Sequence, residues 1–141
     1  MLGEGTFLNL LSFLGDHGPD AATRTVARLA LQDEARHVAF GQAHLEHRLD
    51  TEPELRAGLR HAVERRHDSL RDTAGLNELV LDALVVLAAG SWDPQAIGLG
   101  YDRVPRLQDD MSEGRRRRLG RLGFPPGEAA ELAALHTRNF M

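Results

Sequence analysis

Residues 12–24 read SFLGDHGPDAATR and separate two apolar helical patterns, one over residues 2–14 and one over residues 20–49. Gly18-Pro19 cannot continue a regular helix, so it predicts a short turn at this point. Asp20 follows the turn, where its carboxylate can cap the second helix or favour its first turn. This stretch therefore predicts a long antiparallel helical hairpin.

The rest of the chain predicts shorter helices and an all-α fold. Thr51–Glu54 combines a capping-box pattern with a proline in the first turn. The fourth expected helix is apolar on all sides, which predicts a central, buried position. We expect a single domain, a hairpin over 1–50 with a helical region over 51–141 packed on it. The third helix is expected to begin at this capping box, with Pro53 in its first turn, and to end near Gly75; the later ones cover about 78–89, parts of 94–101 and 104–123, and 128–139.

Composition excludes several functional classes. The 141 residues are 42% hydrophobic and 27% charged, and they include no cysteine, which excludes disulfides, thiolate zinc sites and a cysteine nucleophile. The net charge is −4 and the basic residues cluster only near Arg115–Arg118, a poor pattern for nucleic-acid binding. The apolar stretch Leu79–Ala89 is too short to cross a bilayer, and no basic segment precedes the first apolar run. We therefore expect a cytoplasmic protein that binds neither nucleic acid nor membrane.

Three ionisable residues interrupt the apolar stripes of the hairpin. Glu4 lies on the stripe of the first helix, and Glu34 and His37 lie on that of the second. Burying a lone carboxylate costs several kcal/mol, so such residues need partners. A divalent metal is the strongest partner, and a buried ion pair with Arg28 or Arg36 is the alternative. The stripes consist of Phe7, Leu8, Leu11 and Leu14 in the first helix and Val26, Ala30, Gly41 and Leu45 in the second.

The expected turn places these residues at one level. With the turn centred near Gly18-Pro19, Glu4 and Glu34 both lie about 20 Å from it along their helices. His37 projects from the same face one turn beyond Glu34. A glutamate facing Glu-x-x-His on an antiparallel helix is half of the ligand set of a di-metal carboxylate site in a four-helix bundle.

The residues around Glu34 extend this pattern. Residues 32–37 read QDEARH, and twenty-eight residues lie between Glu4 and Asp33. The resulting E-x28-D-E-x-R-H string resembles the ferritin-like di-iron carboxylate superfamily, including p-aminobenzoate N-oxygenase-like proteins. The resemblance covers residues 1–50. It implies that Glu4, Glu34 and His37 are metal ligands, and that Asp33 and Arg36 orient a ligand histidine of the other half of the bundle.

The chain departs from that superfamily in one respect. A complete site needs a second glutamate and a second Glu-x-x-His. The string Glu64-Arg65-Arg66-His67 has the right letters, but the apolar pattern of its helix predicts that Glu64 and His67 point to solvent. Met1 also stands only three residues before Glu4, so we expect the sequence to be truncated at its start. The other half of the site would come from a missing N-terminal half or from a second copy in a homodimer.

The resemblance implies the C-terminal half of a di-iron oxygenase or oxidase. Two iron ions, or one manganese and one iron, would activate dioxygen for a small-molecule substrate, and the isolated chain supplies half of their ligands. Two alternatives stay open: a homodimeric ferroxidase or iron-storage module, and a non-enzymatic helical interaction protein.

Overall fold

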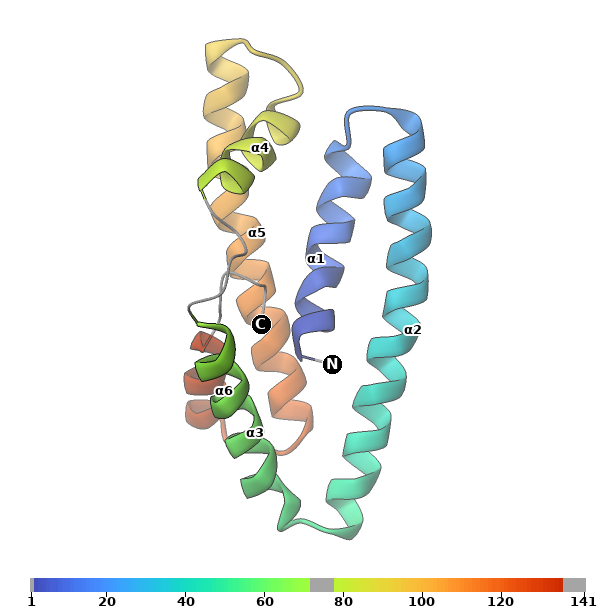
Figure 1. Cartoon of the computed structure of the whole chain (residues 1–141), viewed down its shortest axis with the longest axis vertical. Helices are drawn as coiled ribbons and strands as arrows, with labels where there is room; N and C mark the ends of the chain where they lie inside the picture. Colours follow the sequence, from blue (N-terminus) through green and yellow to red (C-terminus); the bar gives the residue numbers. More distant parts are fainter. Residues whose placement is uncertain (1, 72–77, 136–141) are drawn as a thin grey trace.

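The computed structural model describes residues 2–71 and 78–135 (Figure 1). Over these ranges the chain forms helices and no strand, which confirms the expected all-α fold. The turn before α2 and the Asp20 cap lie where the sequence predicts them, whereas the capping box at Thr51 does not form, because Thr51 is the last residue of α2 and α3 begins at Leu55 without a side-chain cap. The helices are α1 (Leu2–His17), α2 (Ala21–Thr51), α3 (Leu55–Leu70), α4 (Glu78–Ala89), α5 (Pro94–Arg121) and α6 (Pro126–Ala134).

Helices α1 and α2 form the expected hairpin. The Asp20 carboxylate accepts hydrogen bonds from the Thr23 backbone N–H at 2.7 Å and from the Thr23 hydroxyl at 2.9 Å, and so caps α2. Helix α1 continues three residues beyond its expected end, through Gly15 to His17. Gly15 allows the close approach of α2, because a Cβ atom there would lie 3.1 Å from Cγ of Arg28. This glycine therefore serves packing and does not end the helix.

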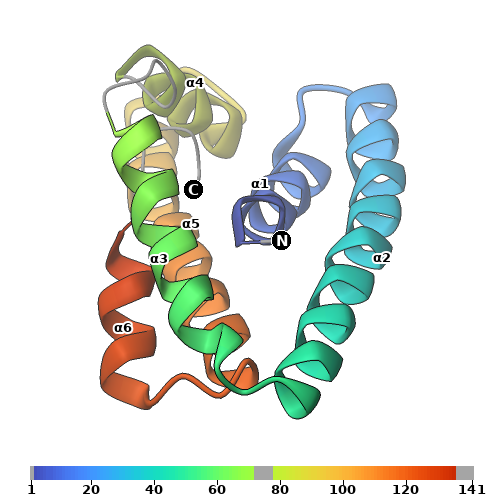
Figure 2. The same cartoon turned by 60° about the horizontal axis from the view of Figure 1, so that its bottom comes forward.

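Helix α1 lies between α2 and α5 (Figures 1 and 2). Helix α5 is continuous from Pro94 to Arg121, whereas the sequence predicted two separate helical parts. Pro105 lies inside it and removes one backbone hydrogen bond without ending the helix. The Asp93 carboxylate caps its start by accepting from the N–H groups of Gln95 and Ala96 at 2.9 and 3.3 Å.

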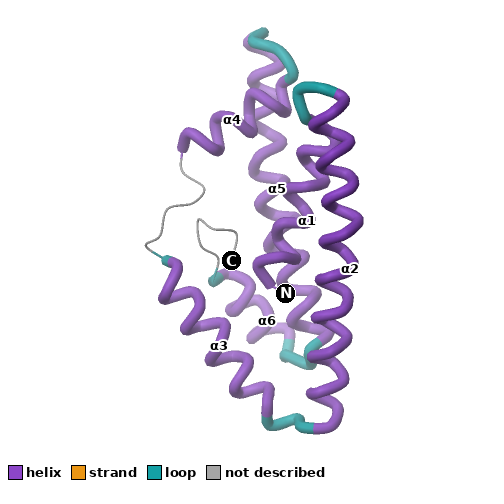
Figure 3. Tube along the Cα trace, turned by 45° about the vertical axis from the view of Figure 1, so that its right-hand side comes forward, coloured by secondary structure: helices purple, strands orange, loops and turns teal. Residues whose placement is uncertain are grey.

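Two apolar clusters hold the helices together. The first joins α1, α4 and α5, and the second joins the end of α2 with the end of α5 and with α6 (Figure 3 shows α4 and α6 against different parts of α5). Apart from partly buried neighbours, the first consists of Phe13, Leu84, Val85, Ala88, Val104, Leu107 and Met111. The second consists of Leu49, Leu119, Leu122, Phe124, Ala129, Leu132 and Ala133.

One expectation about burial is wrong and one is wrong in part. Helix α4 is not central: it packs with one face on α5 and leaves Leu79 77% exposed. Of the stripe predicted for α2, Ala30, Gly41 and Leu45 are partly buried, whereas Val26 is 65% exposed. A 31-residue helix offers several partly apolar stripes, and the neighbouring helices determine which is covered. The buried residues of α2 are Ala27, Val38, Gln42 and Leu49.

Parts of two predicted helices lie outside the described residues. The expected end of the third helix near Gly75 and the Asn77 cap fall in residues 72–77. Helix α6 ends at Ala134, and the remainder of the last predicted helix falls largely in residues 136–141.

The crossing of α4 and α5 yields a stability test. A Cβ atom on Gly100 would collide with the backbone carbonyl oxygen of Val85, whereas one on Gly98 would meet nothing within 4 Å. We expect Gly100→Ala to lower the free energy of unfolding by about 1–3 kcal/mol, because two backbones must separate. Gly98→Ala, in the same helix, should raise it by up to about 1 kcal/mol through helix propensity. Urea denaturation followed by circular dichroism measures both, and equal effects would contradict the close crossing.

Candidate functional site

The Glu34 and His37 side chains lie one turn apart on α2. His37 Nδ1 is 3.4 Å from Glu34 Oε2, so the Glu-x-x-His pair converges as the sequence predicts. The Glu34 side chain is only 23% exposed, whereas that of His37 is 72% exposed. The carboxylate therefore lies close to the hairpin interface, and the imidazole reaches outward from it.

Glu4 occupies the first turn of α1 and is exposed. The pKa of its carboxyl is lowered, mainly by a hydrogen bond to the N-terminal amino group and by that group's charge, and in smaller part by the charge of His37. Glu4 and His37 are therefore close enough to interact electrostatically.

Glu34 and His37 point to different sides of α2. Helix α5 covers one face of the hairpin, where a Cβ on Gly5 would run into the Arg118 guanidinium and where Gln42 Nε2 donates to the Arg118 carbonyl oxygen at 3.1 Å. At 100° per residue, His37 lies about 140° around the α2 axis from Gln42. We call the side of the hairpin turned away from α5 the open face. It carries Glu4 and His37, together with the exposed apolar residues Phe7 and Val26. Glu34 lies within about 40° of the buried residues Ala27 and Val38 around the α2 axis and is mostly covered.

The donor set suits iron or manganese but is incomplete. Two carboxylates and one imidazole are hard and intermediate ligands that these metals accept. Within residues 2–71 and 78–135, however, no three histidine, cysteine or acidic side chains are grouped so that they could hold a metal ion. The expected burial of Glu4 and His37 is wrong for the single chain, because both lie on the open face. The residues fit half of a site, not a closed one.

Asp33 and Arg36 flank this pair on the outer side of α2. Arg36 Nη1 donates to Asp33 Oδ1 at 2.6 Å, and both side chains are more than 70% exposed. An exposed i,i+3 ion pair contributes only a few tenths of a kcal/mol to stability, so the fold does not depend on it.

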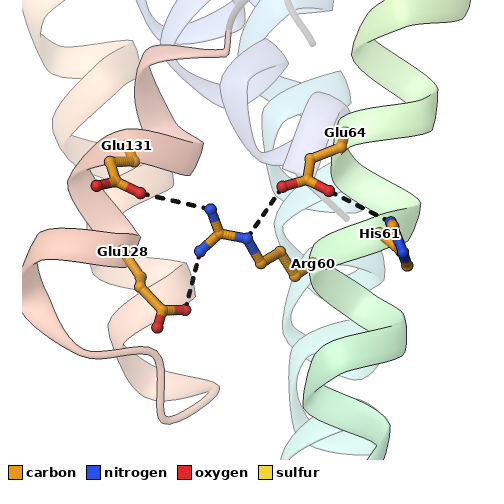
Figure 4. A network of polar contacts seen from close by, with 5 residues as sticks. All are labelled: Arg60, His61, Glu64, Glu128 and Glu131. Atoms are coloured by element: carbon orange, nitrogen blue, oxygen red, sulfur yellow. Dashed lines mark hydrogen bonds and ion pairs between the residues drawn. The ribbon is translucent and has the colours of Figure 1, made fainter.

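The second Glu-x-x-His string belongs to a different cluster. Arg60 of α3 contacts Glu64 at 3.0 Å and reaches Glu128 and Glu131 of α6 at 3.2 and 3.4 Å (Figure 4). The prediction that Glu64 and His67 point to solvent is wrong in part, because their side chains are only 35% and 19% exposed. Hydrogen bonding to Glu64 and then to the α6 carboxylates raises the pKa of Arg60. A guanidinium already occupies the position that a metal would take among these acids.

The basic cluster Arg115–Arg118 of α5 is partly buried. Arg115 is 2% exposed; its Nη2 donates to the Leu135 carbonyl oxygen at 2.7 Å, while its Nε and Nη1 have no hydrogen-bond partner among the described residues. Burial, followed by the charges of Arg115 and Arg117, lowers the pKa of Arg118 to about 10. Arg121 instead pairs with Glu46 of α2 at 2.8 Å. No local sequence signal distinguishes these three arginines, because the packing of α5 between other helices determines their burial.

The comparisons with known proteins add no family assignment: no family model, no curated protein and no solved structure matches the chain. In the described part of the chain, no helix is both long enough and apolar enough to span a membrane.

The Arg60 cluster makes a prediction about local stability. Arg60 joins α3 to α6, and these helices otherwise touch through a small apolar contact. We expect Arg60→Gln to speed amide hydrogen exchange in α3 by a few-fold, with little change in α1 and α2. Arg65→Gln, an exposed neighbour on the same helix, serves as the matched control and should leave the exchange unchanged. Equal exchange in both variants would show that the ion pairs do not hold α3.

Proposed function

We propose that this chain supplies one half of a ferritin-like, carboxylate-bridged di-metal site in a dioxygen-activating protein. The observation that carries the proposal is the convergence of Glu34 and His37 one turn apart on α2, with Nδ1 of His37 3.4 Å from Oε2 of Glu34. The His37 imidazole is 72% exposed, so it can meet groups from outside the chain. The E-x28-D-E-x-R-H resemblance supports the same conclusion.

The roles of the residues follow from their positions. Glu34, whose side chain is 23% exposed, would hold the metal ions together with Glu4 and His37. A bound pair of iron ions, or of manganese with iron, would supply the redox chemistry by which dioxygen is reduced and a small substrate gives up electrons. Asp33 and Arg36 would position groups of the second hairpin. That hairpin would come from a second copy or from another polypeptide segment, and the cytoplasm is the proposed location.

A docking function without chemistry is the second candidate. The exposed apolar residues Val26, Leu29 and Phe40 on α2 favour it, since a single helix that exposes several large apolar side chains marks an interaction surface. Metal binding separates the two candidates, because a docking protein has no need of Glu34 and His37 as ligands.

Iron content after anaerobic loading with Fe(II) tests the metal proposal. We expect about one iron per chain, since a complete site holds two ions and each hairpin supplies half of the ligands. Glu34→Ala and His37→Ala should each lose most of this iron. The matched control is Glu64→Ala, which removes the acid of the other Glu-x-x-His string and should retain the iron. A wild-type chain that binds no iron, or iron that survives both hairpin variants, would exclude the di-metal site.

A further inference from the structure

Helix α2 exposes a stripe along its outer side in which two charged residues lie between two apolar ones. Leu29, Asp33, Arg36 and Phe40 follow one another at intervals of four, three and four residues, so they fall within about 60° of one another around the helix axis. Leu29 is 56% and Phe40 76% exposed, and the side chains of Asp33 and Arg36 are 71% and 74% exposed. We call these four residues the α2 stripe.

The α2 stripe is self-complementary when read in the opposite direction. If two copies of α2 lie antiparallel about a two-fold axis between Glu34 and Ala35, Leu29 of one copy faces Phe40 of the other. In the same register, Asp33 faces Arg36 of the other copy. Each contact occurs twice because of the symmetry, which is the defining property of an isologous interface. Apolar residues thus meet apolar residues at both ends, and opposite charges meet at the centre.

We propose that a second copy of this chain covers the α2 stripe in this antiparallel arrangement. The charged residues at the centre of the stripe favour a second copy over other partners. Asp33 and Arg36 already neutralise each other at 2.6 Å within one copy, and in the pair each also gains an opposite charge across the interface. A partner helix of a single charge sign would leave either the acid or the base facing a like charge. The second copy satisfies both and covers Leu29 and Phe40 as well.

The candidate metal site lies away from this interface. At 100° per residue, Glu34 lies about 130° around the α2 axis from the middle of the stripe, and its side chain is only 23% exposed. The pairing needs no metal and does not depend on the proposed function.

Sedimentation of the metal-free protein, with a chelator present, tests the pairing. We expect the wild type to dimerise, and Asp33→Arg or Arg36→Asp alone to weaken the dimer by about tenfold or more, because each places like charges opposite each other twice. An equimolar mixture of the two variants should restore dimers, since every charged contact is then between opposite charges. Asp102→Arg, an exposed acid on α5, is the matched control and should dimerise like the wild type.

Three results would overturn the proposal: a monomeric wild type, single variants that dimerise as the wild type does, or a mixture that stays monomeric. Circular dichroism verifies the helical fold of each variant, and Phe40→Ala tests the apolar end without a change in charge; it too should weaken the dimer. Because no metal is present, this experiment can fail while iron binding succeeds, and the reverse.

Discussion

The packing of α1 against both α2 and α5 is the constraint on which the other features of this structure depend. On one side, Gly15 allows α1 to approach Arg28 of α2 closely. On the other, Gly5 faces the Arg118 guanidinium of α5. A helix covered from two sides leaves a limited sector free, and the hairpin therefore has one face against α5 and one open face. The exposed candidate ligands Glu4 and His37 lie on the open face.

This arrangement determines the electrostatic state of the candidate ligands. Glu4 and His37 are exposed and keep most of their hydration, whereas the Glu34 carboxylate is only 23% exposed and lies 3.4 Å from His37. The single chain therefore avoids most of the several kcal/mol that burial of all three without a partner would cost. The same residues would become buried only when another hairpin covers them, and at that point they need a metal or another counter-charge. Association and metal binding would then be coupled, because association buries the ligand side chains and a bound metal compensates for the free-energy cost of burying them.

Helix α5 shows the opposite case, in which charges are buried within the chain. Arg115 is 2% exposed with part of its guanidinium unpaired, and it lies near Arg118. An arginine remains charged even when burial lowers its pKa, so this part of the structure carries an unfavourable electrostatic term. The long arginine stems offset some of it by packing among apolar residues, such as those of the second cluster.

The sequence by itself determined the local features: the all-α class, the hairpin turn at Gly18-Pro19, the Asp20 cap and the one-turn spacing of Glu34 and His37. These features depend on residues close in sequence and on the helical repeat, and not on which helices pack together. Only the tertiary structure decided which stripe of α2 is buried, that α5 runs unbroken through Pro105, that Glu64 faces Arg60, and that Arg115 lies inside while Asp33 and Arg36 lie outside. The metal role of Glu4, Glu34 and His37 stays a prediction from the sequence. Burial could not be read from the sequence because it depends on which helices lie against one another, and several stripes of one long helix are almost equally apolar.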